Sequence, residues 1–119
     1  MAKALAAKRG EIWMVNFNPS VGSETRKVRP AIIVGVDTIG RLPLRIVVPI
    51  TEWKTPYAHF PWFVFLAPSP LNGLMKDSGV DAFQVKSVSE ARFVRRLGDV
   101  TSGQLDDIAS AIGLCVGVP

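Results

Sequence analysis

The feature that most constrains the fold is a series of short apolar segments, each stopped by proline, glycine or asparagine. Glu11–Phe17 alternates in the way typical of a strand buried mainly on one side. Pro30–Val36 and Arg45–Thr51 predict two more strands, joined as a hairpin by the turn near Gly40. Candidate strands over 59–66, 78–85, 86–89 and 92–97 continue the series, which gives roughly five to seven short strands.

The C-terminal segment changes from strand to helix periodicity. Thr101 and Gln104 form a capping-box pattern, which predicts a helix start. The apolar residues that follow at helical spacing are Leu105, Ile108, Ala109, Ile112 and Val116. We therefore expect a mainly β or α+β fold, a small SH3-like curved β-barrel with a C-terminal amphipathic helix.

The chain has 119 residues, enough for one domain and too few for two. We expect a loosely ordered N-terminus over residues 1–9 and a single domain over 10–119. No apolar run approaches the roughly 20 residues that a membrane-spanning helix needs. With one cysteine, Cys115, the chain has no internal disulfide. These observations favour a cytoplasmic protein without a membrane partner.

Positive charge is concentrated in the first half of the chain. Residues 1–60 hold nine Lys and Arg against four acidic residues, whereas residues 61–119 hold five against six. Such an excess can serve solubility alone, and a nucleic-acid backbone is the leading specific partner.

Arg29 is the first candidate for chemistry. Pro30 restricts Arg29 to an extended backbone conformation. A guanidinium held at the start of a strand can donate hydrogen bonds to two phosphate oxygens. The alternative is an ordinary salt bridge. Ser23 and Glu24 lie upstream in the same loop and approach Arg29 only if that loop folds back over the sheet.

Thr51 ends the third predicted strand. Arg29 and Thr51 each lie eleven residues from Gly40, so the hairpin places them at the same end. The alternative is a threonine chosen for its β-branched shape. Trp53 and Tyr57, in the following loop, are candidates for base stacking or loop anchors.

Other polar residues are candidates for binding a substrate. Strand alternation places Gln84 and Lys86 on a solvent-exposed face, opposite Phe83 and Val85. Together with the residues of the basic loop, the predicted substrate-binding set is Ser23, Arg26, Lys27, Trp53, Gln84 and Lys86. The sequence holds no cluster of His, Cys and Asp at metal-binding spacing, so no metal and no cofactor is expected.

The order of several motifs resembles the MazF/PemK family of toxin endoribonucleases from type II toxin-antitoxin systems. The segments that carry the resemblance are Arg9–Trp13, Pro19–Glu24, Val28–Val34, Val48–Thr51, Gln84–Ser87 and Arg92–Gly98, followed by the terminal helix. Each segment is short, but their order and spacing together cover almost the whole chain from residue 9.

The resemblance implies a homodimer that cuts single-stranded RNA at short sequence motifs without a metal, and that a cognate antitoxin blocks. In the family, the ribose 2′-hydroxyl attacks the adjacent phosphate and leaves 2′,3′-cyclic phosphate and 5′-hydroxyl ends. The family's catalytic positions fall on Arg29 and Thr51, and its loop positions on Ser23 and Glu24. Arg29 suits charge stabilisation, and Glu24 is a natural base.

The chain departs from the family at one position. Some members use an acidic residue directly before the glutamine of the Gln84–Ser87 segment, and here that position holds Phe83, with Asp81 two residues earlier.

Two other functions remain open. One is a gyrase-poisoning toxin on the same fold, a group that relies on a tryptophan near its C-terminus, which this chain lacks. The other is a non-catalytic barrel that binds RNA or protein.

Overall fold

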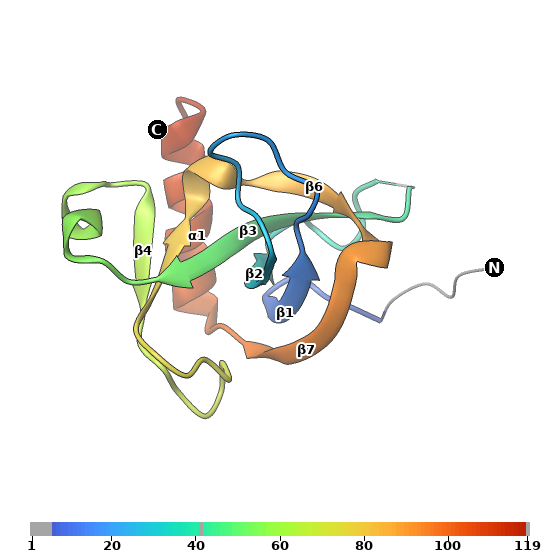
Figure 1. Cartoon of the computed structure of the whole chain (residues 1–119), viewed down its shortest axis with the longest axis horizontal. Helices are drawn as coiled ribbons and strands as arrows, with labels where there is room; N and C mark the ends of the chain where they lie inside the picture. The colour runs from blue at the N-terminus through green and yellow to red at the C-terminus, as the bar shows by residue number, and fades with distance from the viewer. Residues whose placement is uncertain (1–5, 41, 119) are drawn as a thin grey trace.

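The computed structural model describes residues 6–40 and 42–118, which form a curved antiparallel sheet with one α-helix packed against it (Figure 1). The strands are β1 (Glu11–Asn16), β2 (Val28–Ile33), β3 (Leu44–Glu52), β4 (Phe63–Leu66), β5 (Ser78–Asp81), β6 (Lys86–Ser89) and β7 (Phe93–Asp99). Short 3₁₀ helices η1 (Thr55–His59), η2 (Ala82–Gln84) and η3 (Glu90–Arg92) connect them, and α1 spans Ser102–Cys115. The mainly β class with a C-terminal helix is confirmed.

The sheet follows the order β4-β5-β3-β2-β1-β7, and β6 pairs with β3 off this path. The long strand β3 therefore divides one edge between two partners, with residues 44–47 paired to β6 and residues 50–52 paired to β5. Strands β4 and β7 lie at the two ends of the path, and no ladder joins them within the described residues. The expected barrel is thus an open, curved sheet.

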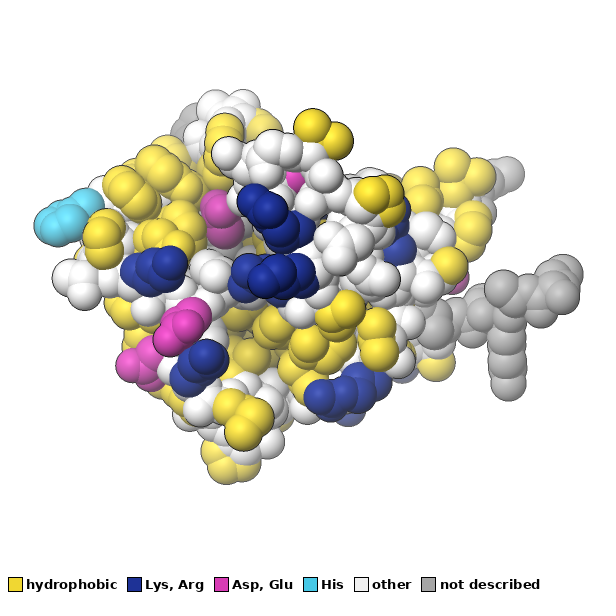
Figure 2. Space-filling view, in the orientation of Figure 1, with side chains coloured by type: hydrophobic (Ala, Val, Ile, Leu, Met, Phe, Trp, Pro, Cys, Tyr) yellow, Lys and Arg dark blue, Asp and Glu magenta, His cyan; other side chains and the backbone are white. Residues whose placement is uncertain are grey.

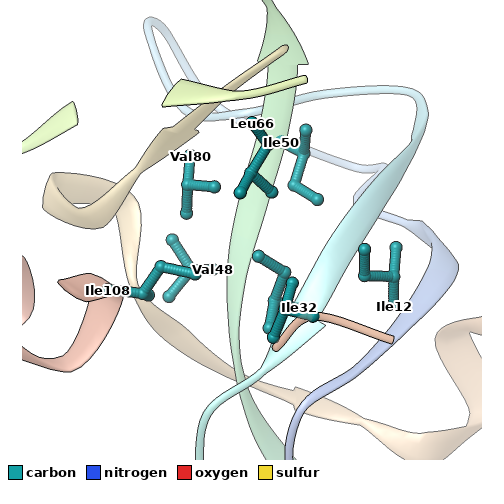
Figure 3. Packing of buried hydrophobic residues seen from close by; sticks show 8 residues of the cluster. Ile12, Ile32, Val48, Ile50, Leu66, Val80 and Ile108 are labelled. Atoms are coloured by element: carbon teal, nitrogen blue, oxygen red, sulfur yellow. The ribbon is translucent and has the colours of Figure 1, made fainter. Parts of the chain in front are cut away.

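Each face of the sheet packs its own apolar core. Ile12, Ile32 and Val48 belong to the core beneath α1, together with Ile108 of the helix (Figure 3). The opposite face packs a second core, whose buried residues are Ala7, Val15, Phe17, Ala31, Ile33, Val47 and Val88. The prediction that the first strand is buried mainly on one side was wrong, because the curved sheet is covered on both faces and buries Ile12 as fully as Val15.

The C-terminal helix begins as predicted. The Thr101 hydroxyl accepts a hydrogen bond from Gln104 N–H at 3.1 Å, and the Gln104 side-chain oxygen accepts one from Thr101 N–H at 2.9 Å. These two bonds satisfy backbone donors that the first turn would leave unpaired. Ile108 and Ala111 then turn the apolar side of α1 onto the sheet.

Two predicted strands are shorter than expected. The strand predicted over 59–66 begins only at Phe63, because His59 ends η1, which has Pro56 in its first turn, and residues 61–62 form a turn. Strand β5 stops at Asp81, whose carboxylate accepts a hydrogen bond from Phe83 N–H at 3.2 Å and so begins η2. Strand alternation therefore does not apply at this point. The Gln84 side chain hydrogen-bonds to Thr25, whereas Phe83, expected on the apolar face, is exposed.

The segment before β1 is held to the sheet where the structure describes it. Ala7 is buried in the second core, and Arg9 Nε donates to the Val34 carbonyl at 2.9 Å. The remainder of the loosely ordered N-terminus predicted for residues 1–9 falls on residues 1–5, outside the described residues. Over the described part of the chain, no helix combines the length and apolar character needed to cross a membrane.

Candidate active site

Arg29 and Thr51 face each other where the β2–β3 ladder ends. The last ladder pair is Ala31 with Pro49. The same register continued by two residues sets Arg29 opposite Thr51, but Pro30 and Pro49 have no N–H to extend the ladder. The strands are thus free to part, and Arg29 Nη1 lies 3.5 Å from Thr51 Oγ1. The prediction that both residues lie at one end of the hairpin is confirmed.

The Arg29 side chain is oriented by its own loop. Its Nε donates to the Arg26 carbonyl at 3.1 Å, which leaves the two terminal nitrogens directed toward Thr51 and solvent. In the part of the chain that the structure describes, no carboxylate forms a salt bridge with this half-buried guanidinium. The salt-bridge alternative therefore finds no support, and the fork of donors remains available for an anion.

The loop between β1 and β2 folds back over the sheet, as the approach of Ser23 and Glu24 to Arg29 requires. Gln84 anchors it: its side-chain oxygen accepts hydrogen bonds from Thr25 N–H at 2.6 Å and from the Thr25 hydroxyl at 2.7 Å. Within the loop, Glu24 Oε1 accepts a hydrogen bond from Val21 N–H at 2.7 Å. The side chain of Gln84 is thus bound to the loop.

These residues enclose a cleft of about 230 Å³, hereafter the reaction cleft. Its walls come from the β1–β2 loop, the parted ends of β2 and β3, and the β4–β5–η2 region. The lining residues are Ser23, Glu24, Thr25, Arg26, Arg29, Pro49, Ile50, Thr51, Tyr57, Phe63, Asp81 and Gln84.

Asp81 is a cleft residue that the sequence did not predict. Thr51 pairs with Gly79 in the β3–β5 ladder, and Asp81 lies two residues further along β5 on the same face. Burial raises the pKa of the Asp81 carboxyl above its ordinary value, against the hydrogen bonds from Phe83 N–H and Gln84, which lower it. The cleft therefore holds two carboxylates in different environments, since Glu24 is exposed on the loop.

Aromatic rings form one wall of the cleft because β5 carries a glycine beneath them. A Cβ on Gly79 would lie 3.1 Å from both the Trp53 and Phe63 rings and 3.4 Å from Tyr57. Tyr57 stacks on Phe63 with centroids 4.0 Å apart, and both rings line the cleft. Trp53 instead packs edge-on against Tyr57 and Phe65, outside the lining.

The structure brings together some of the predicted substrate-binding residues and separates others. Arg26 lines the reaction cleft, whereas Lys27 and Lys86 do not. Lys27 adopts a φ of 69°, and its N–H donates to Asn18 Oδ1 at 3.0 Å. Lys86 Nζ lies 6.0 Å from the centre of the Phe17 ring.

Figure 2 shows Lys and Arg side chains gathered at the middle of this face, with hydrophobic side chains on the β4 side of them. The cleft lies between a cationic and an aromatic wall, a combination suited to the phosphate and the base of a nucleotide. Among the described residues, no group of three or more His, Cys, Asp or Glu side chains is placed to hold a metal ion.

Tyr57, a candidate for base stacking from the sequence, lines the cleft, whereas Asp81 and Phe63 are among the lining residues that sequence reasoning did not assign to the site. Asp81 carried a signal, because it precedes the predicted polar cluster at Gln84 by three residues. Phe63 carried none beyond its aromatic character, since its place depends on pairing between β4 and β5.

Comparison with known proteins gives matches along most of the chain. Residues 8–116 match the family described as PemK-like, MazF-like toxin of type II toxin-antitoxin system. The chain is 32% identical over 113 residues to endoribonuclease MazF9 of Mycobacterium tuberculosis, covering 90% of this chain and 93% of that protein. It is 23% identical to endoribonuclease MazF of Staphylococcus saprophyticus, covering 93% and 92% of the two chains.

Solved structures show the same fold. MazF from Deinococcus radiodurans superposes with a TM-score of 0.78 at 23% identity, covering 94% of this chain and 97% of that one. An endoribonuclease in complex with its cognate antitoxin, from a mycobacterial species, gives a TM-score of 0.75 at 20% identity, covering 96% and 98%. Since the family match spans almost all of the chain, the resemblance seen in the sequence is confirmed: the chain belongs to the PemK-like, MazF-like toxins of type II toxin-antitoxin systems.

Proposed function

We propose that this chain is an endoribonuclease that cuts single-stranded RNA within short sequence motifs and needs no metal ion. The ribose 2′-hydroxyl attacks the adjacent phosphorus, and the bond from phosphorus to the 5′-oxygen breaks. The products carry a 2′,3′-cyclic phosphate and a 5′-hydroxyl. Both curated relatives named above are endoribonucleases, which supports the reaction class.

The observation that carries the proposal is the pairing of the Arg29 guanidinium with the Thr51 hydroxyl at 3.5 Å in the reaction cleft. A phosphate between them would accept hydrogen bonds from the two terminal nitrogens of Arg29 and from Thr51. Because charge increases on the phosphoryl oxygens in the transition state, donors fixed at this position bind that state more tightly than the substrate.

Arg29 acts through charge rather than through proton transfer. An arginine keeps its proton at any physiological pH, so it is a poor acid and a worse base. Thr51 orients a phosphate oxygen through its hydroxyl, and its own orientation is fixed by the ladder with β5.

The attacking hydroxyl must lose a proton and the leaving 5′-oxygen must gain one. Glu24 is our candidate base, since it is an exposed carboxylate on the cleft wall. Asp81 is a second carboxyl in the same cleft, with a raised pKa that favours retention of a proton. An exposed carboxyl and a half-buried one in the same cleft are suited to act as base and acid in one reaction.

We further propose that the active protein is a cytoplasmic homodimer, without a membrane partner, and that a cognate antitoxin keeps it inactive. Its single domain corresponds to residues 10–119. Two of the related structures support an antitoxin partner, since one is an endoribonuclease with its cognate antitoxin and another is a MazE–MazF complex.

The test is incubation of the protein with a long, weakly structured RNA in EDTA, followed by mapping of the ends. We expect cleavage with 5′-hydroxyl and cyclic phosphate ends. Arg29→Ala should slow it by about 100-fold or more, as loss of a transition-state donor does elsewhere. Arg29→Lys should fall between, because lysine keeps the charge and loses the fork.

Lys8→Ala is the control, since it removes a positive charge from an exposed residue outside the cleft. It should cleave at the wild-type rate. Absence of cleavage by the wild type across RNAs of varied sequence, or loss of cleavage in EDTA, would contradict the proposal. A wild type that inhibits DNA gyrase and cuts no RNA would identify the gyrase-poisoning alternative.

A further inference from the structure

Phe83 is a large apolar side chain held in solvent by a rigid backbone. Phe83 is 72% exposed and is the middle residue of η2. The residue before it, Ala82, is fully buried, and its N–H donates to the Trp62 carbonyl at 3.1 Å. At the same end of η2, the Asp81 carboxylate accepts from Phe83 N–H. At the other end, the Gln84 side-chain oxygen accepts from Thr25. The short helix is thus fixed at both ends, and the ring projects from a fixed point.

A groove of about 450 Å³ lies beside this ring, lined by Ser23, Glu24, Phe83, Gln84, Val85 and Lys86. Three of these residues, Ser23, Glu24 and Gln84, also line the reaction cleft. The two hollows therefore share a wall, and a chain bound at Arg29 can continue directly past Phe83.

The charges along this path suit a nucleotide chain. Arg26 and Arg29 lie in the reaction cleft, and Lys86 lies in the groove with the exposed ring. Glu24 is the acidic residue on the shared wall, and its Oε1 is already bonded to Val21 N–H. Each nucleotide of an RNA strand carries its base on the ribose between two phosphates, and the two hollows together offer cations for phosphates and an aromatic ring for a base.

We propose that the groove beside Phe83 holds one unpaired base next to the cleaved phosphate, stacked on the Phe83 ring, with Lys86 contacting the following phosphate. This subsite rests on the nuclease function proposed above. It makes Phe83 a specificity-determining residue, at the position where some family members carry a carboxylate. Every base has a flat π-face, so an exposed ring on a fixed backbone binds bases without rearrangement.

The test compares Phe83→Leu and Phe83→Trp with the wild type. Leucine keeps apolar character and removes the ring, whereas tryptophan keeps a ring that stacks. Cleavage of a long transcript, with ends mapped by sequencing, gives the base preference at each flanking position. A short RNA containing the preferred motif gives KM and kcat separately.

We expect Phe83→Leu to raise KM by about five- to tenfold, the lower part of the range for loss of one base stack, with kcat within about twofold. Its base preference should weaken at one flanking position only, and Phe83→Trp should retain both properties. Phe65→Leu is the matched control, because Phe65 is also an exposed phenylalanine (47%) but lines neither hollow. It should behave as the wild type.

The subsite and the nuclease function fail in different ways. A wild type that cleaves RNA, with an unchanged KM and base preference in Phe83→Leu, overturns the subsite alone. A wild type that neither cleaves RNA nor binds 2′-methoxy RNA, which resists cleavage, overturns both. If Phe83→Leu binds that RNA normally but loses affinity for an antitoxin peptide, the groove belongs to a protein partner and the proposal is wrong.

Discussion

At the scale of single residues, Thr51 allows a role in catalysis to be tested apart from a role in folding. It is half-buried at the end of β3, with its hydroxyl toward Arg29. Thr51→Val keeps the β-branched shape that the strand uses and removes only the hydroxyl. We expect a cleavage rate about 100-fold lower, with the free energy of unfolding changed by less than about 0.5 kcal/mol.

RNA cleavage assays and thermal unfolding measure the two effects. Thr51→Ser is the control, since it retains the hydroxyl, and it should keep most activity. A valine variant that cleaves normally, or one that unfolds at a much lower temperature, would show Thr51 to be a structural residue.

Asp81 gives a prediction about pH. Burial raises the pKa of its carboxyl in the folded protein, so the folded state binds this proton more tightly than the unfolded state does. The ionised form is therefore a cost to folding, absent below the ordinary value of 3.8 and growing as pH rises through the folded pKa. Asp81→Asn removes this titration and keeps an oxygen to accept from Phe83 N–H.

The measurement is denaturant unfolding of wild type and Asp81→Asn at several pH values from 3 to 7. The stability of the variant relative to the wild type should rise with pH across that window and then level off. A constant difference would mean that Asp81 titrates like an exposed carboxyl.

At the scale of elements, the β1–β2 loop is positioned by a residue far away in the sequence. Gln84 of η2 accepts two hydrogen bonds from Thr25, across a separation of 59 residues. Gln84→Ala removes both. We expect unfolding free energy to fall by about 1–3 kcal/mol, since a net hydrogen bond contributes about 0.5–1.5 kcal/mol, and activity to fall because Glu24 and Arg26 move with the loop.

Amide hydrogen exchange at Thr25 reports on this loop directly, and it should become faster in Gln84→Ala. Gln84→Glu keeps an acceptor oxygen and should retain slow exchange. Equal exchange at Thr25 in the alanine variant and the wild type would mean that other contacts hold the loop.

The strands show where sequence patterns predict elements and where they do not. The hairpin of β2 and β3 could be predicted because alternation, a turn and two prolines all lie within one short segment. The end of β5 could not, because the Asp81 side chain competes for the backbone and starts η2 in an apolar segment that otherwise resembles a strand. As a result, the Phe83 side chain is exposed to solvent and the Gln84 side chain contacts the β1–β2 loop.

At the scale of the whole molecule, the net charge of +4 has two possible explanations, solubility or affinity for a nucleic-acid backbone. Salt dependence separates them. The cleft and the adjoining groove hold Arg26, Arg29 and Lys86. If three phosphates are neutralised, the logarithm of the association constant for 2′-methoxy RNA should fall with the logarithm of salt concentration with a slope of about −2.

Fluorescence anisotropy over a salt series measures this slope. Lys86→Gln should flatten it by about 0.7, the value for one phosphate on a single strand, and Lys8→Gln should leave it unchanged. A slope near zero would assign the positive charge to solubility.

Sequence patterns were enough to predict the succession of short strands along the chain, the capped helix and the meeting of Arg29 with Thr51, because each of these depends on periodicity and turn chemistry within a short stretch of chain. The open sheet, the burial of both its faces, and the entry of Asp81 and Phe63 into the cleft became visible only in the folded structure. These features depend on pairing between distant segments, since β3 takes its edge partners from β5 and β6 and the β1–β2 loop is anchored by Gln84. Local patterns carry no information on such pairings.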